Sequence, residues 1–322
     1  MLFQDDTELM EPIVSNSLEV DLLLKNLQEI CQYYRIINAF GYTETTKNFL
    51  KSSYETLDTF DFSTCSKEEF EQILRNKAEE LSNQLDIAYE GWFKDTFAKI
   101  AYKLKTDSGV ASKIADKLVI IKALSPEKMA LVLNNKLGFA FYTPENLQKM
   151  IKYMDAAVKF AAENEALLRE TKKSFITRKM SSDQVKSALN KVRQESEILV
   201  EKYRDIKQDA TVAKGTFTDE EDTPASQGWT KEKVISVIQA WLDAGAGKLN
   251  KLKLILTNVE KWGYNFKVRP SIAMNTNGDY FPIVEVESIA KEEMEQLIRF
   301  IHETLSLYES VDSSIYRFVK KF

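Results

Sequence analysis

The sequence predicts a mainly α-helical protein: an elongated multi-helix bundle with a long antiparallel helical hairpin and a small β-hairpin near the C-terminus. Three observations lead to this fold class. The 322 residues include only 10 glycines and 6 prolines, about 5% of the chain where roughly 12% is usual, so long uninterrupted elements are expected. Hydrophobic residues make up 44% of the chain, which is enough for a core. Apolar residues also recur at steps of three and four residues, which is the helical period.

The first third of the chain reads as three helices. An apolar stripe over residues 18–37 predicts an amphipathic helix that ends near Gly41, and Thr43 is placed to cap a short second helix through Leu50. A loop over residues 58–64 then leads to Ser66 and Glu69. Their spacing is that of a capping box, in which each side chain binds the other residue's free amide. We therefore expect a long helix to begin here.

Two matched heptad patterns occupy the middle of the chain. A helix over residues 110–124 and another starting at Ser125-Pro126 come first, with proline in the first turn. Apolar residues then step four and three over residues 147–168 and again over residues 185–206. Such seams predict either an antiparallel helical hairpin, which we favour, or a dimeric coiled coil. Glu165 and Ser196 interrupt the two seams.

The C-terminal third changes character twice. Thr230 is placed to cap a helix through Leu242, and Gly245 and Gly247 are expected to separate it from a second helix over residues 249–259. Residues 264–287 are rich in Val and Ile and contain the turn dipeptide Asn277-Gly278, so a β-hairpin is predicted there. A final helix over residues 288–309 and a basic tail over residues 317–321 complete the chain.

A stretch without periodicity supplies the domain boundary. Residues 216–228 hold the run Asp219-Glu220-Glu221-Asp222 and then a proline, which is typical of a flexible acidic linker. The expected organisation is an acidic N-terminal segment (1–19), an N-terminal helical domain (20–210), an acidic linker (211–229) and a C-terminal helical domain (230–322).

Export, membrane insertion and a disulfide framework are not indicated. The first six residues are acidic where a secretory signal would be basic. The longest apolar windows are much shorter than the roughly 20 residues of a membrane-spanning helix, so no membrane span is expected. Cys31 and Cys65 are the two cysteines, and we expect both to be free thiols in a reducing compartment.

No pattern indicates a catalytic, metal or cofactor site. His302 is the one histidine of the chain; it lies in a helical pattern and is expected at a helix surface or boundary. A metal site would have to combine His302 with two separated cysteines and with carboxylates, without the close ligand pairs of zinc sites. The sequence Gly245-Ala246-Gly247-Lys248 lacks the spacing of a phosphate-binding loop. We expect no enzyme activity and no cofactor.

Charge is unevenly distributed along the chain. The net charge is −5, which argues against a surface that grips nucleic acid everywhere. Residues 1–29 are strongly acidic, whereas residues 245–269 are basic and include aromatic residues, a mixture that could contact DNA. The other interpretation, which we favour, is a solvated helix face. The candidate nucleic-acid contacts are Lys248, Lys251, Lys253, Lys261, Lys267 and Arg269.

Two regions resemble internal head proteins of large tailed bacteriophages. In the N-terminal region, residues 33–43 (YYRIINAFGYT) are followed by Phe49-Leu50 and by residues 54–58 (YETLD). Those proteins similarly place a helix that ends in a Gly-Tyr or Gly-Val turn before a Glu-Ser-Leu-Asp-like element. In the C-terminal region, Gly228-Trp229 opens a helical pair that also looks like theirs. As a layout, the resemblance covers nearly the whole chain.

The resemblance implies a non-enzymatic virion protein. Such a protein is made in the cytoplasm of the infected host, is enclosed in the capsid with the genome and can be ejected with the DNA. Its partners would be capsid or other virion proteins, genomic DNA and further copies of itself. Proteins of this class are often cut by a maturation protease after a small residue, any residue and Glu. Ser17, Leu18 and Glu19 match that pattern, and the cut would fall before Val20.

One departure from the family matters, and two other function classes stay open. A DNA-condensing protein would be basic, whereas this chain is acidic, so a filler, inner-scaffold or ejected role suits it better than genome condensation. Long amphipathic helices with few breakers are also typical of α-helical membrane-active or toxin-like effectors. A helical scaffold or interaction protein outside any virion is the third interpretation.

Overall fold

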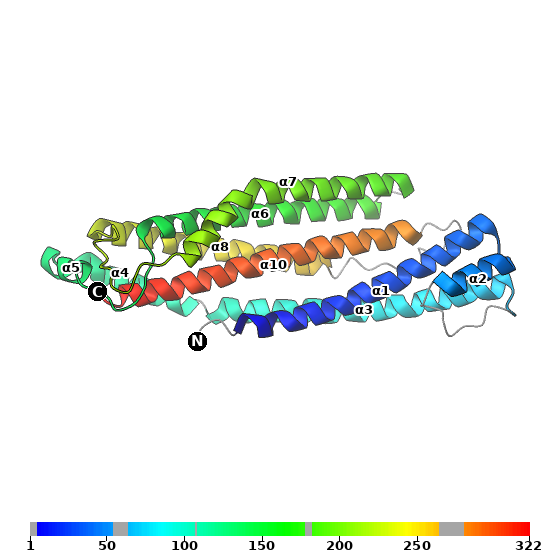
Figure 1. The fold of residues 1–322 in the computed structure, drawn as a ribbon, viewed down its shortest axis with the longest axis horizontal. Helices are drawn as coiled ribbons and strands as arrows, with labels where there is room; N and C mark the ends of the chain where they lie inside the picture. The colour runs from blue at the N-terminus through cyan, green and yellow to red at the C-terminus, as the bar shows by residue number, and fades with distance from the viewer. Residues whose placement is uncertain (1–4, 54–63, 107, 178–181, 264–279) are drawn as a thin grey trace. The chain divides into compact units, whose positions relative to one another are not determined.

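The computed structural model describes residues 5–53, 64–106, 108–177, 182–263 and 280–322 (Figure 1). These residues form helices joined by turns and contain no strand, so the mainly α-helical class is confirmed for them. The helices are α1 (Asp5–Phe40), α2 (Glu44–Ser53), α3 (Lys67–Thr106), α4 (Ser108–Ala123), α5 (Pro126–Leu133), α6 (Pro144–Thr177), α7 (Ser182–Gly215), α8 (Lys231–Gly263) and α10 (Tyr280–Val319).

The chain divides into two compact units, and each draws on three separate stretches of sequence. The first unit comprises residues 1–99, 168–192 and 260–294. The second comprises residues 100–167, 193–259 and 295–322. The sequence segment read as an acidic linker, residues 211–229, lies inside the second unit.

The core of the first unit lies between α1, α2 and α3. The apolar stripe of α1 is buried from Val20 to Ile37, and the stripe of α3 is buried from Phe70 to Ala88, as the three- and four-residue steps predict. The Tyr34 hydroxyl of α1 donates to the backbone carbonyl of Glu71 in α3, at 2.8 Å. This bond and the two buried stripes hold α1 against α3.

A buried ammonium group also belongs to the first unit. Lys291 of α10 is 1% exposed, and its Nζ lies 2.5 Å from Oδ1 of Asp21 in α1. Lysine is almost never fully buried unless it is paired. The pair therefore ties α10 to α1 within this unit.

The core of the second unit collects aromatic residues from several helices. Trp229 at the start of α8 is buried, and its indole N–H donates to the backbone carbonyl of Tyr142, at 3.0 Å. Phe318 of α10 lies against both Trp229 and Phe141. A buried Trp needs a partner for its N–H, and the end of the segment before α6 supplies it.

The predicted β-hairpin is not supported, because α10 begins at Tyr280 and residues 280–287 are helical. Residues 264–279, with Pro270 and Asn277-Gly278, lie outside the described residues. Pro282 lies in the first turn of α10, where its missing N–H would be unpaired in any case. The Val and Ile residues that suggested strands therefore lie in a helix.

The predicted break at Gly245 and Gly247 is wrong, because α8 runs unbroken from Lys231 to Gly263. Glycine is tolerated inside a helix at a cost of about 1 kcal/mol relative to alanine. Gly245 is buried, and a Cβ atom there would lie only 2.6 Å from Cε2 of Tyr308. This glycine is therefore a point of close packing between α8 and α10.

Candidate functional site

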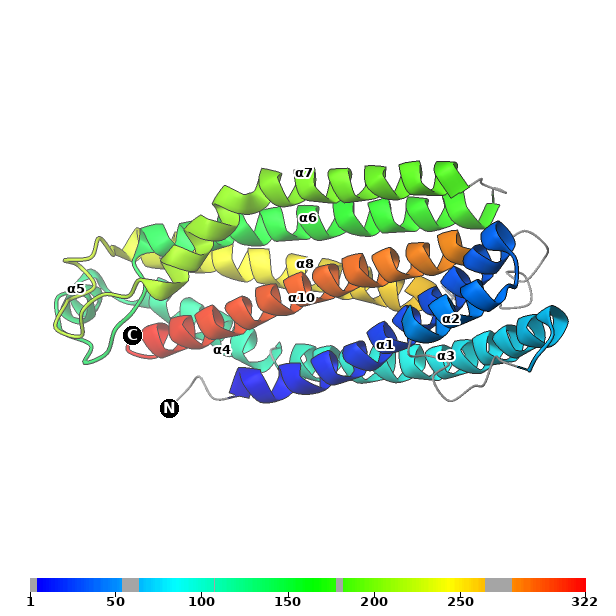
Figure 2. The ribbon, with the colours of Figure 1, turned by 45° about the vertical axis from the view of Figure 1, so that its right-hand side comes forward.

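A groove in the second unit is the strongest candidate for a functional site among the described residues. It has a volume of about 520 Å³ and is lined by side chains from residues 153–164 of α6, 200–212 of α7 and 296–303 of α10. Figures 1 and 2 show these three helices running beside one another. The size falls within the range of 300–1,000 Å³ that is usual for small-molecule sites.

Aromatic contacts fix the register of the three helices around the groove. The ring of Phe160 in α6 packs edge-on against Tyr203 of α7, with the centroids 5.4 Å apart. It also packs against Phe300 of α10, at 4.4 Å. The hydroxyls of Tyr153 in α6 and Thr304 in α10 lie 3.0 Å apart and share a hydrogen bond. Because 153 meets 304 and 160 meets 300, α6 and α10 run in opposite directions here.

Small and apolar side chains form most of the groove surface. Ala156 and Ala157 lie on α6 between Tyr153 and Phe160, so short side chains there leave room between the aromatic rings. Val200 and Val212 of α7 also line the groove and are 44% and 62% exposed. Apolar surface left in contact with water is a feature of binding grooves.

The groove carries an excess of positive charge. Its lining includes Arg204, Lys207 and Arg299 but only one carboxylate, Glu303. Lys207 pairs with Glu303 at 2.9 Å, and Arg204 pairs with Glu201 on its own helix. Arg299 is exposed and forms no ion pair with the described residues. An anionic group in the groove would thus find an available cation.

Asn164 is the one lining residue with an unsatisfied buried polar atom among the described residues. Its side chain lies at the α6 end of the groove and is 2% exposed, and its Oδ1 has no hydrogen-bond partner. A buried polar atom without a partner costs about 1–3 kcal/mol. The sequence offered a weak signal for this position, since Asn164 precedes Glu165, which breaks the heptad seam and is also buried.

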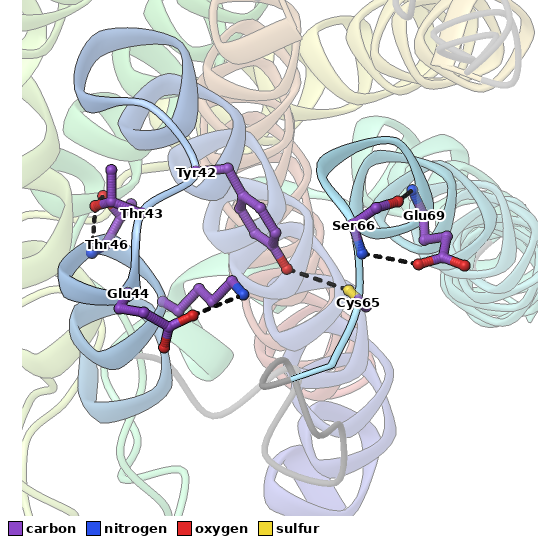
Figure 3. A network of polar contacts seen from close by, with 8 residues as sticks. Tyr42, Thr43, Glu44, Thr46, Cys65, Ser66 and Glu69 are labelled. Atoms are coloured by element: carbon purple, nitrogen blue, oxygen red, sulfur yellow. Dashed lines mark hydrogen bonds and ion pairs between the residues drawn. The ribbon is translucent and has the colours of Figure 1, made fainter.

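A second set of polar contacts, in the first unit, holds the junctions of α1, α2 and α3 (Figure 3). The Tyr42 hydroxyl lies 3.1 Å from Sγ of Cys65, and burial together with this bond raises the pKa of Tyr42. The predicted capping box is confirmed: the Ser66 amide donates to Glu69 at 2.8 Å, and the Glu69 amide donates to Ser66 Oγ at 3.2 Å. These bonds lower the pKa of Glu69. Their role is to fix helix ends.

The second unit holds one buried carboxylate beside an indole. Asp312 of α10 is 2% exposed, and its Oδ1 accepts a hydrogen bond from the Trp241 N–H at 2.9 Å. Burial raises the pKa of Asp312 from 3.8 to about 6, and the Trp241 bond partly opposes that rise. Trp241 stacks on Tyr308, with the centroids 5.0 Å apart. This group is enclosed in the core, away from the groove.

The candidate nucleic-acid contacts do not form one face in the described part of α8. Lys248 pairs with Asp155 of α6. Lys251 and Lys253 are exposed, but two helical residues lie about 200° apart around the axis, so these side chains leave opposite sides. Lys261 is exposed near the end of α8. The other two candidates, Lys267 and Arg269, lie outside the described residues.

The candidate processing residues, Ser17 to Val20, lie within α1. Leu18 is 62% exposed, whereas Val20 is fully buried in the core of the first unit. Proteases act on locally opened chain. Cleavage before Val20 therefore requires this part of α1 to open.

The remaining candidate residues have structural positions. His302 is buried, at 8% exposure, so its predicted place at a helix surface or boundary is wrong. Cys31 and Cys65 are free thiols as expected, and burial raises the pKa of Cys31 to about 12. The described residues contain no cluster of three or more metal-ligating side chains. None of the described helices has a stretch long and apolar enough to cross a membrane.

No protein-family model, curated protein or solved structure matches this chain.

Proposed function

We propose that this chain is a non-enzymatic structural protein packaged inside a bacteriophage capsid with the genome. Its resemblance to internal head proteins is concentrated at two helix junctions, and these junctions carry the proposal. The partners proposed with it are capsid or other virion proteins and further copies of the chain. The proposed locations are the host cytoplasm during assembly and then the virion interior.

Both junctions have the same construction in this protein. Gly41 and Gly228 have φ values of +78° and +82°, in the left-handed region that favours glycine. Each is followed by a packed aromatic residue, Tyr42 or Trp229, and then by a threonine that caps the next helix. Thr43 Oγ1 accepts from the amide of Thr46, and Thr230 Oγ1 accepts from the amide of Lys233, both at 3.2 Å. The residues that resemble the family are thus the ones that redirect the chain.

We include the antiparallel hairpin of α6 and α7 in the proposal. Within the second unit, the Tyr142 hydroxyl before α6 donates to the carbonyl of Lys214 near the end of α7. Further along, Glu163 of α6 pairs with Lys202 of α7 at 2.9 Å. Because the numbers rise on one helix as they fall on the other, these contacts support antiparallel packing. A continuous rod of this kind suits a protein stacked inside a shell.

Two details of the proposal rest on single segments. Removal of residues 1–19 by a maturation protease is supported by the match at Ser17, Leu18 and Glu19. Contact with genomic DNA is supported only by the basic stretch around α8 and is opposed by the net charge of −5. We therefore propose a filler or inner-scaffold role, with ejection alongside the DNA, ahead of genome condensation.

Mass spectrometry of purified particles tests the packaging role. The experiment uses a phage that encodes the chain, and peptides are mapped with and without labelling of free N-termini. Packaged copies that begin at Val20 would support both packaging and processing, and copies that begin at Met1 would support packaging alone. A particle without the chain would remove the proposal.

The groove favours a second candidate function, that of a helical scaffold or interaction protein outside any virion. Its support is the apolar surface around Val200 and Val212, which the second unit leaves in contact with water. The two functions differ in location. A chain that is abundant in infected cells but absent from particles would favour the second.

A further inference from the structure

We propose that the groove binds a small amphiphile made of an apolar body, a hydrogen-bond donor such as an amide N–H, and an anionic group. The inference stands on the groove itself and does not depend on the virion role. Three properties of the lining select this class of ligand: its apolar length, the unpartnered acceptor on Asn164 and the available charge on Arg299.

The apolar body is selected by the aromatic and alanine surface of the groove. The lining extends from Tyr153 to Asn164 along α6, a rise of about 16 Å at 1.5 Å per residue. Ala157 and Phe160 lie between these ends, and Phe300 of α10 lies opposite them. An extended acyl chain fits this length and would cover apolar surface that otherwise contacts water.

The donor is selected by Asn164. Its Oδ1 is buried in a helix bundle without a hydrogen-bond partner. Such an atom is satisfied when a ligand brings an N–H or O–H group to it, and ligands that lack the donor are then discriminated against. The ligand should therefore carry its donor at the Asn164 end of the groove.

The anionic group is placed by the register of α6 and α10. Phe160 meets Phe300 and the helices run in opposite directions, so Asn164 lies opposite Gln296, four residues before Phe300. Arg299 is one turn from Gln296 on the same helix. A ligand that donates to Asn164 thus has its next few atoms near the Arg299 guanidinium. N-acyl amino acids have this order of groups: acyl chain, amide N–H, then carboxylate.

The test uses a matched pair of probes. N-dodecanoylglycine has an amide N–H, and N-dodecanoylsarcosine replaces that hydrogen with a methyl group. Binding to the full chain is measured by isothermal titration calorimetry below the concentration at which the probes form micelles. We expect saturable binding of one N-dodecanoylglycine per chain and binding of the sarcosine probe that is about 5–10-fold weaker, the worth of one buried hydrogen bond. No binding, or equal binding of both probes, would overturn the proposal.

Variants locate the site. Asn164→Leu should remove the preference between the two probes and should leave the melting temperature of the free protein unchanged or higher, because an unsatisfied buried atom is lost. Arg299→Gln should weaken both probes, whereas Arg193→Gln, an exposed arginine of α7 outside the groove, should weaken neither. Ala157→Phe should block binding. Unchanged binding in Asn164→Leu and Ala157→Phe, or a dimer that buries the groove in light scattering, would refute the assignment.

Discussion

Gly245 and Gly247 offer a direct test of how α8 packs against α10. Both lie inside α8 two residues apart, and both were expected to break it. A Cβ atom at Gly245 would lie 2.6 Å from Cε2 and from Cζ of Tyr308, and closer still to its hydroxyl. A Cβ atom at Gly247 would meet nothing within 4 Å. Replacing each by alanine therefore changes helix propensity alike but changes packing at only one site.

The expected magnitudes follow from those distances. Glycine to alanine inside a helix stabilises by up to about 1 kcal/mol, and this gain applies to both variants. At Gly245 the ring of Tyr308 must shift, and it stacks on Trp241, so an overpacking cost of about 1–3 kcal/mol is added. We expect Gly247→Ala to raise the free energy of unfolding and Gly245→Ala to fall below it by about 1–3 kcal/mol.

Urea denaturation followed by circular dichroism measures both values, with the slope checked for a change in the unfolded state. The variant Gly245→Ala should cost less in a Tyr308→Leu background, because the ring atoms that meet the new Cβ are gone. Equal stabilities for Gly245→Ala and Gly247→Ala would refute the close approach of α8 and α10.

Three further predictions concern charge and capping. Because burial raises the pKa of Asp312 to about 6, the folded state keeps a proton that the unfolded chain releases. This contribution to the free energy of unfolding is fully present below pH 3.8 and is lost as the pH rises through 6. The wild-type protein should therefore lose about 2–3 kcal/mol relative to Asp312→Asn between pH 4 and 7 in urea titrations; parallel curves would contradict this. Asp21→Ala should cost about 1–3 kcal/mol in thermal unfolding, because the buried Lys291 ammonium loses a partner, whereas an unchanged melting temperature would argue against the pair. Ser66→Ala should cost about 1 kcal/mol in urea by removing the N-cap of α3, and a cost near zero would argue against the capping box.

Local rules were sufficient for most helix boundaries. The capping box at Ser66, the turn at Gly41 and the cap at Thr230 depend only on residues within one turn of the helix end, so the sequence contains all the information needed. The buried stripe from Phe70 to Ala88 likewise follows from its three- and four-residue steps. These features are predictable because neighbours along the chain determine them.

The errors arose where distant residues decide. Gly245 remains helical because Tyr308, more than 60 residues away, packs where a side chain would be. Residues 280–287 contain Val and Ile at spacings that suit either a strand or a helix, and a proline that suits the first turn of a helix as well as an edge strand. His302 was judged from its own segment, but its burial is decided by the helices around α10.

The groove could not be predicted for the same reason. Phe160 and Tyr203 lie in the two heptad patterns and were interpreted as core residues, as heptad positions usually are. Their register against Phe300 of α10 depends on a helix nearly 100 residues further along the chain. Asn164 then becomes a buried atom without a partner only in that assembly.

Protease protection of intact particles tests the central proposal most directly. Purified particles are treated with a nonspecific protease before and after the capsid is opened, and peptides of the chain are quantified by mass spectrometry. Packaging predicts that the chain survives in intact particles and is digested once they are opened. Digestion in intact particles, or absence from both samples, would contradict a place inside the capsid.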